Sequence, residues 1–488
     1  MKLLSPPNAR PVRRPVTLIA LASVALLSAC ASLAPAGGEL PETPLPAAWS
    51  STPVNAAAVP SPTALAGWWQ RFNDPTLTTL VTQALQANNS VKSAQAALLQ
   101  ARAQRDVQQA GMGPTLGVSA SAQRGKSGDN DASNRFQAGF DASWEPDVFG
   151  GNRSALNASE ADTRASETSL ADVQVSLAAE VAVNFIELRS LQTRLAIARS
   201  NLAAQTETLQ ITRWRTQAGL ASSLDLEQAI ASSEQTAAQI PALQTSIAQA
   251  LNGLAVLTGQ APGTLPAALQ SALTTAAPVP QGAGDLALAF PAETLRQRPD
   301  VRTAEHRISA ALSRVAAADA ARYPSFRLSG SLGLSALTLG TLSNGASVVS
   351  SLLGSVSAPL FDGGAARAQV RSQEAALEQA RVAYQGTVIS AVKDVEDALV
   401  ALQGDRQRLL RLQAASAAAA NAALLARQRY ESGLIDFRSV LDTQRTLLST
   451  QDSVASTQAT LSADHVRLYK ALGGGWTPDA PPVEATTR

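Results

Sequence analysis

The sequence is poor in the residue types that carry enzyme chemistry. Its 488 residues include one cysteine and two histidines, and aromatic residues make up only 4% of the chain. His306 and His465 lack the neighbouring ligands that a metal site requires, and no phosphate-binding loop or nucleophile motif occurs. One cysteine cannot form a disulfide within the chain. We therefore expect a protein that is not an enzyme and that holds no metal and no cofactor.

Charged residues are also scarce, at 16% of the chain, and the formal net charge is +1. Residues 1–29 carry four positive charges and no negative one, so the chain without them has a formal net charge of −3. Without a basic surplus there is no electrostatic footprint for DNA or RNA, and we expect no nucleic-acid partner. Alanine, glutamine, serine and leucine are abundant instead, which favours closely packed helices.

The amino terminus has the pattern of a targeting segment. A basic stretch precedes an apolar run at residues 16–27, which is too short to span a membrane comfortably as a helix. Leu27-Ser28-Ala29-Cys30 follows and resembles the bacterial lipoprotein box, whose cysteine carries the lipid. We expect a signal peptide at residues 1–29 and a lipid on Cys30. Ala31, in place of aspartate, favours sorting to the outer membrane by the same resemblance. The alternative is an ordinary signal peptide in which the cysteine occurs by chance.

The chain is internally duplicated. Sites in the first half recur about 210 to 214 residues later: Asn88-Asn89-Ser90-Val91 and Arg298-Pro299-Asp300-Val301, Pro114 and Pro324, Gly219-Leu220 and Gly433-Leu434. A repeat of this kind predicts two copies of one structural unit in each chain.

Each half contains one very long helical segment. Residues 151–218 and 364–432 lack proline, and the first carries a seven-residue period: Val181, Leu188, Leu195, Leu202, Leu209. This period predicts helices packed side by side as in a coiled coil. Such a helix is roughly 100 Å long at 1.5 Å per residue, so it must pack along a bundle or tube. Pro241, in the returning helix of the first half only, predicts a kink or a local break.

Short stretches with a period of two lie between the helices. Phe136, Phe140 and Trp144 alternate with small or polar residues, and we expect strands at about 114–124, 134–145, 325–335 and 346–358. One apolar face over about ten residues is what a membrane β-barrel strand needs. The alternative is a half-buried soluble sheet. Four strands cannot close a barrel, and lipid tolerates no open sheet edge, so membrane insertion would require several copies of the chain.

These features together resemble the TolC-like outer-membrane efflux channels, in particular the lipoprotein branch (NodT-type) that serves resistance–nodulation–division pumps. The resemblance covers about residues 65–475 and rests on these motifs in order: Trp68-Trp69 with Phe72 and Asp74-Pro75, Trp144-Glu145-Pro146-Asp147-Val148-Phe149-Gly150, Arg298-Pro299-Asp300-Val301, Tyr430-Glu431-Ser432-Gly433, and Phe437 with Val440-Leu441-Asp442 and Gln444-Arg445.

The resemblance implies a mainly α-helical fold with transmembrane β-strands. Three copies would each give four strands to a twelve-stranded barrel and their helices to a periplasmic α-barrel. The channel would be lipid-anchored in the outer membrane, extend into the periplasm, and pass drugs or other small molecules outward. Its partners would be a periplasmic adaptor (membrane fusion protein), an inner-membrane pump and outer-membrane lipid. The alternatives are a coiled-coil structural or adaptor lipoprotein without a pore, or the outer-membrane channel of a protein secretion system.

The expected organisation follows the repeat. The segments are the signal peptide 1–29, a lipid-anchored tether 30–67, the first repeat 68–260 with its long helix 151–218 and return helix 222–258, an equatorial linker 261–290, the second repeat 291–472 with its long helix 364–432 and return helix 436–472, and a tail 473–488.

The resemblance also places a gate at the turns between the long and the return helices. Gly219 and Gly433 would form the turns at the periplasmic tip, where family members close their tunnel. Tyr430 stands at the position of the family's gate-contact tyrosine. Ile435 occupies a position where some members carry a basic latch residue, so the latch chemistry of this chain departs from theirs.

Two aspartates complete the expected gate. Asp225 and Asp442 stand where family members carry aspartates at the tip. Carboxylates repeated around a threefold axis crowd a narrow opening, where they favour cations and resist closure unless they are neutralised or hydrogen-bonded. The alternative is that both side chains are solvated or cap the start of a helix.

Overall fold

The computed structural model describes residue 41 and residues 65–126, 128–129, 131–282 and 292–476. The expected signal peptide and Cys30 lie outside these residues. The chain divides into two compact units. Unit 1 includes residues 102–162 and 307–381, and the described part of unit 2 contains residue 41 and residues 65–101, 163–282, 292–306 and 382–476.

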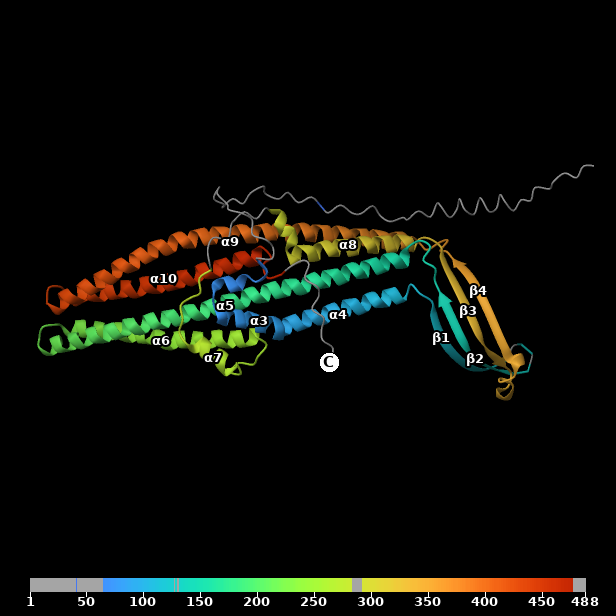
Figure 1. Cartoon of the computed structure of the whole chain (residues 1–488), viewed down its shortest axis with the longest axis horizontal. Helices are drawn as coiled ribbons and strands as arrows, with labels where there is room; N and C mark the ends of the chain where they lie inside the picture. Colours follow the sequence, from blue (N-terminus) through green and yellow to red (C-terminus); the bar gives the residue numbers. More distant parts are fainter. Residues whose placement is uncertain (1–40, 42–64, 127, 130, 283–291, 477–488) are drawn as a thin grey trace, which may run out of the picture. The chain divides into compact units, whose positions relative to one another are not determined.

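Unit 1 contains a four-stranded antiparallel sheet (Figure 1). Its strands are β1 (Thr115–Gly125), β2 (Ser133–Trp144), β3 (Ser325–Ala336) and β4 (Val348–Ser357), in the order β1-β2-β3-β4. The β2–β3 pairing therefore joins the two halves of the duplication. At its centre Gly139 faces Gly333, where an added Cβ would lie 2.8 Å from the opposite Cα. This close approach requires glycine on both strands.

The two faces of the sheet differ in chemistry. Strand register places these exposed apolar side chains on one face: Leu116, Val118, Phe140, Leu332, Leu352, Val356. On the other face Ser119 donates to Asp141 at 2.5 Å, and the Ser331 and Ser351 hydroxyls lie 2.8 Å apart. Val349 and Leu353 of β4 share this polar face, which explains the weak alternation of the fourth strand. We call the first side the apolar face.

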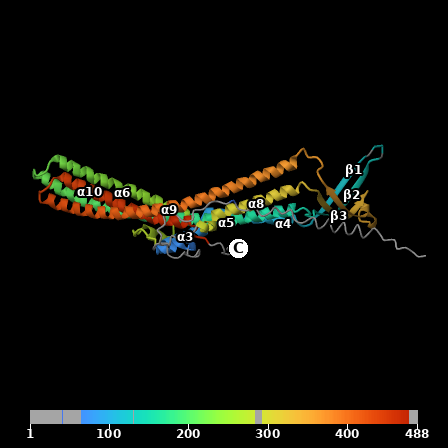
Figure 2. The same cartoon turned by 90° about the horizontal axis from the view of Figure 1, so that it is seen from above.

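The helices confirm the expected pair of long hairpins. Helices α5 (Gly151–Gln217) and α9 (Ala365–Glu431) have 67 residues each, and α6 (Ser223–Leu257) and α10 (Phe437–Ala471) have 35 each. The shorter helices are α3 (Pro75–Ala87), α4 (Asn89–Ala110), α7 (Ala267–Thr274) and α8 (Pro299–Ala320), with 3-10 turns η1 (Trp68–Phe72), η2 (Ala292–Gln297), η3 (Leu339–Thr341) and η4 (Gly345–Ser347). Within unit 2, α6 and α10 run alongside one another (Figure 2). The equal helix lengths show that the two repeats fold alike.

Polar contacts join α5 to α10 in unit 2. Arg194 forms an ion pair with Asp452 at 2.7 Å, and Asn201 donates to Gln451 at 2.8 Å. About two turns further along, Gln444 donates to Thr208 at 3.0 Å. Polar side chains therefore fix the register between the two hairpins, where alanine-rich surfaces alone would allow sliding.

The core of unit 2 explains the aromatic motif near residue 70. Trp68 of η1 is fully buried and stacks on Tyr469 of α10, with ring centroids 5.4 Å apart. Phe72 contacts both rings edge-on. Aromatic pairs of this kind add about 0.5–1.5 kcal/mol beyond the area that they bury. The motif therefore attaches the first described segment to the last long helix.

The duplication is visible in one pair of hydrogen bonds. The Asn88 side chain donates to the carbonyl oxygen of Leu257 at 2.9 Å, and Arg298 donates to that of Ala471 at the same distance. Leu257 and Ala471 are the last residues of α6 and α10. The glycine two residues later has φ near 75° in both repeats, a conformation that other residues rarely adopt. Both repeats therefore close their return helix in the same way.

The sequence predicts a kink or a local break at Pro241, and the structure contradicts the break, whereas the kink stays a prediction. Helix α6 continues through this residue as one element. Pro241 is exposed, and Thr245 still bonds to its carbonyl oxygen. A proline removes one backbone hydrogen bond, and its ring crowds the carbonyl group four residues earlier; on the exposed side of α6, water can bond to that carbonyl group while the helix continues.

Three helices are long and apolar enough to cross a membrane, by length and composition only. They are α5, α6 and α9, with mean hydropathy of 1.2–1.3 over their most apolar windows. Half of the α5 window is buried inside the protein, whereas only 11% of the α6 window and 17% of the α9 window are buried.

Candidate functional site

The turns between long and return helices lie in unit 2 and have the same backbone geometry. Gly219 has φ of 76° and Gly433 has φ of 73°. Leu220 N donates to the Arg215 carbonyl at 2.7 Å, and Leu434 N donates to the Arg429 carbonyl at 2.8 Å. These bonds end each long helix at a glycine in the left-handed conformation, which glycine adopts without strain.

Aspartates take part in capping the returning helices just after these turns. Asp225 accepts from the Ser222 hydroxyl at 2.8 Å and from its backbone N–H at 3.2 Å, while Ser222 accepts from the Asp225 N–H at 3.1 Å. This is a capping box. In the second repeat Asp436 is the cap, and its hydrogen bonds with the Ser439 side chain and N–H hold the pKa of this carboxyl below its usual value. Sequence reasoning missed Asp436, although an aspartate before an apolar helical run is a usual cap signal.

Tyr430 is buried where the two hairpins meet. Its ring contacts Phe437 edge-on, with centroids 5.8 Å apart, inside a cluster with Val440 and Leu441. Its hydroxyl lies 3.2 Å from the Thr212 hydroxyl of α5. Ile435 is partly buried against the same cluster, so its apolar side chain contributes to packing.

Two arginines that sequence reasoning missed connect α5 to α9 beside Tyr430. The Arg215 guanidinium lies 4.5 Å from the centroid of the Tyr430 ring and donates to the Tyr430 carbonyl oxygen. Arg427 forms ion pairs with Glu207 of α5 at 2.5 Å and with Glu431 at 2.9 Å. We call Arg215, Tyr430 and Thr212 the tip clasp, because they join the ends of the two hairpins within one chain.

Asp442 is not part of the tip clasp. Its side chain is exposed and forms no hydrogen bond or ion pair with any residue that the structure describes. Among the described residues, therefore, none holds this carboxylate in place. Asp225, by contrast, is already used in its capping box.

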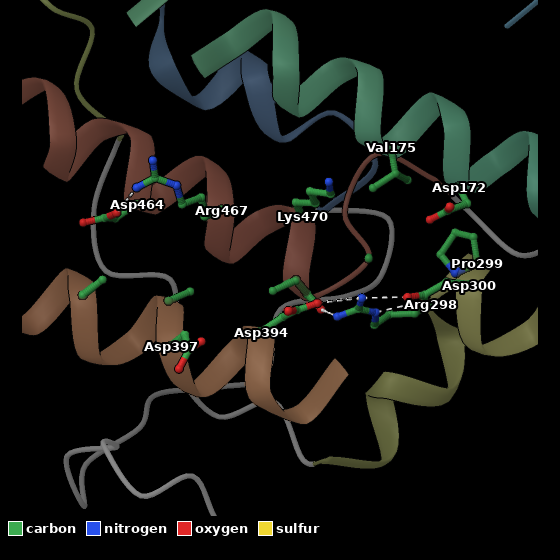
Figure 3. A pocket seen from close by; sticks show the side chains of 14 residues that line it. Asp172, Val175, Arg298, Pro299, Asp300, Asp394, Asp397, Asp464, Arg467 and Lys470 are labelled. Atoms are coloured by element: carbon green, nitrogen blue, oxygen red, sulfur yellow. Dashed lines mark hydrogen bonds and ion pairs between the residues drawn. The ribbon is translucent and has the colours of Figure 1, made fainter. Parts of the chain in front are cut away.

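A charged cavity of 390 Å³ lies further along unit 2 (Figure 3). Arg298 forms ion pairs with Asp300 at 2.7 Å and Asp394 at 3.1 Å, so its guanidinium joins the start of α8 to α9. Burial and the nearby Asp300 raise the pKa of Asp172, and burial raises that of Asp464, which accepts from Arg467 at 2.6 Å. Most of these charges bind one another, so the cluster holds helices together.

The described residues contain no group of three or more histidine, cysteine, aspartate or glutamate side chains that could hold a metal ion. His465 bonds to the Leu461 carbonyl oxygen of its own helix at 2.8 Å, and burial lowers the pKa of His306. We therefore interpret both histidines as residues of the helix packing.

Comparison with known proteins identifies relatives over nearly the whole chain. A family model described as outer membrane efflux protein matches twice, at residues 80–260 and 290–474. The chain is 31% identical to the outer membrane protein OprJ of Pseudomonas aeruginosa, covering 95% of this chain and 97% of OprJ. It is 30% identical to nodulation protein T of Rhizobium leguminosarum bv. viciae, over 92% of each chain. The solved structure of the outer-membrane channel OprN superposes with a TM-score of 0.81 at 35% identity, covering 87% of this chain and 98% of OprN.

Proposed function

The chain belongs to the outer membrane efflux protein family, and from this premise we propose that three copies close one passive conduit for drugs or other small molecules. It is the outer-membrane channel of an efflux pump, extends into the periplasm and performs no covalent chemistry. In the proposed assembly, a periplasmic adaptor and an inner-membrane pump supply the substrate and the energy.

The four-stranded sheet carries this proposal. Its apolar face suits lipid, but β1 and β4 each keep one unpaired edge within the chain. Exposed backbone groups at a sheet edge are not tolerated in hydrocarbon, so the sheet must pair with other copies. Three copies give twelve strands, more than the eight that merely fill their own interior. Serines and Asp141 on the opposite face would then line a wet lumen.

Purified protein in a planar bilayer should form pores whose conducting unit has the mass of three chains. Single-channel recording, combined with mass measurement of the solubilised complex, checks this result. If the protein is instead a structural or adaptor lipoprotein without a pore, no current should be recorded. Silent bilayers with a correctly assembled trimer at all applied voltages would contradict the open conduit, and a stable monomer would contradict the assembly.

We place the gate of this channel at the two tip turns. The tip clasp supports this placement, because it ties together the two hairpin ends that would have to separate during opening. Asp442 supplies the second element: its exposed carboxylate has no described partner, and threefold symmetry would repeat it around the axis. Asp225 plays a lesser part because its capping box occupies it.

We further propose that Cys30 carries the lipid anchor. The Cys30→Ser variant should lose all incorporation of labelled acyl chains, because the acceptor thiol is gone. Labelling cells with an alkyne fatty acid checks this result, with Ser28→Ala as a variant that keeps the thiol. Continued labelling of Cys30→Ser would refute the anchor without affecting the channel proposal. Attachment by more than one acyl chain is stable, whereas one chain binds only marginally.

A further inference from the structure

One charged residue lies on the apolar face of the sheet. In the four strands, all of which are described, the register places 22 positions on this face, and only Arg124 is charged. It stands opposite Asn134 at the end of β1, and Lys126 follows at the start of the turn to β2. Both side chains are exposed and form no hydrogen bond or ion pair with any described residue.

The other end of the same face carries an aromatic residue. Trp144 ends β2, and its indole N–H donates to the Met112 carbonyl oxygen at 3.0 Å. Helix α5 begins a few residues later, whereas the strand end at Arg124 leads only into a hairpin turn. The helices extend into the periplasm, so Trp144 marks the periplasmic end of the sheet and Arg124 the outer end.

The separation of these two ends matches a membrane. Asn134, beside Arg124, is ten residues from Trp144, which is about 34 Å along an antiparallel strand. A strand tilt of about 35–45° reduces this to roughly 26 Å along the membrane normal, close to the apolar band of about 25 Å in outer-membrane barrels. Arg124 therefore stands at the level of the lipid headgroups in the outer leaflet.

A guanidinium at this level needs an anionic partner. Within hydrocarbon its charge would be costly, and its aliphatic stem allows the head group to reach the interface. Guanidinium groups bind phosphate with paired hydrogen bonds. The β3–β4 turn, residues 337–347, contains no charged residue, so the cationic site is confined to the first hairpin.

We propose that Arg124 and Lys126 bind the phosphate groups of the glycolipid that forms the outer leaflet of the outer membrane. This inference rests on the proposed insertion of the sheet as a barrel. Asp129 and Asp131 lie further along the turn and would repel phosphate, so binding depends on the two cations at the strand end. Arg135 stands opposite Gln123 on the polar face, away from lipid, and provides a matched control on the same hairpin.

The test is titration of the purified assembly with doubly phosphorylated lipid A, read by native mass spectrometry. A basic residue near an anionic lipid surface contributes a factor of about five, so the double variant Arg124→Gln, Lys126→Gln should bind on the order of twentyfold more weakly. The Arg135→Gln variant should bind as the wild type does. Dephosphorylated lipid A should bind the wild type as weakly as the double variant binds the phosphorylated lipid.

Equal binding by the double variant and the wild type would overturn the proposal. Equal loss in Arg135→Gln, or undiminished binding of the dephosphorylated lipid, would also overturn it, since recognition would then be non-specific or made by acyl chains. Conductance of each variant is recorded in parallel. A wild type without pores refutes the channel, whereas normal pores without phosphate preference refute only the lipid site.

Discussion

Replacing Arg298 by alanine should lower the free energy of unfolding of the protein by about 1.5–3 kcal/mol, because the variant loses charged hydrogen bonds from a largely buried guanidinium to carboxylates that are themselves partly exposed to water. The Arg298 side chain is only 10% exposed and binds Asp300, Asp394 and the carbonyl oxygen at the end of α10. Its loss strands two carboxylates and one carbonyl group at the same place. Urea unfolding followed by helical circular dichroism measures the effect.

The matched control is Lys393→Ala on the neighbouring face of α9. Lys393 pairs with Asp397 at 2.5 Å, but its side chain is 71% exposed, and such surface pairs contribute little to stability. Arg298→Lys should recover only part of the loss, because one ammonium cannot reproduce the forked contacts. Similar midpoints for Arg298→Ala and Lys393→Ala would show that Arg298 does not hold the helices together.

Replacing Arg215 by alanine should raise the conductance of the assembled channel by about an order of magnitude or more. The variant loses two interactions. The cation–π contact with the Tyr430 ring contributes about 2 kcal/mol where water is excluded, and the charged hydrogen bond to the Tyr430 carbonyl oxygen contributes about 1.5–3 kcal/mol. Each copy would then hold its two hairpin ends together less tightly, which favours opening. Single-channel recording in planar bilayers measures the change.

Arg213→Ala controls for the loss of positive charge on the same turn of α5, because Arg213 is exposed and only contacts Gln210 weakly at 3.4 Å. Its conductance should stay at the wild-type value. Asp442→Ala tests the second gate element in the same recordings, where loss of a contact between copies should also raise conductance. Unchanged currents in Arg215→Ala, with normal assembly, would remove the tip clasp from the gate.

Much of the fold could be predicted because its signals are local. The seven-residue period and the missing prolines predicted the long helices, and the period of two predicted four strands. The duplication added a second, independent reading of every element. The local break allowed for at Pro241 is absent, because the exposed position of this residue allows α6 to continue.

The tip clasp could not be predicted in the same way. Its contacts depend on which faces of α5 and α9 meet, and residues about 215 positions apart in the chain give no local signal of that. The resemblance pointed to Tyr430 but not to its partner Arg215. The capping role of Asp225, which the sequence left open as an alternative, is indicated by Ser222 three residues earlier.

The matching closures at Leu257 and Ala471 have a consequence for the origin of the chain. A gene encoding one repeat would specify two strands and one long hairpin, with its own way of ending the return helix. Six such half-length products, in place of three, would have to find one another to complete the same ring. Fusion of the two repeats halves the number of chains that must assemble. It also allows the ends of the two return helices to diverge in sequence: the neutral amide of Asn88 bonds to the end of α6, whereas the Arg298 guanidinium, paired with two carboxylates, bonds to the end of α10.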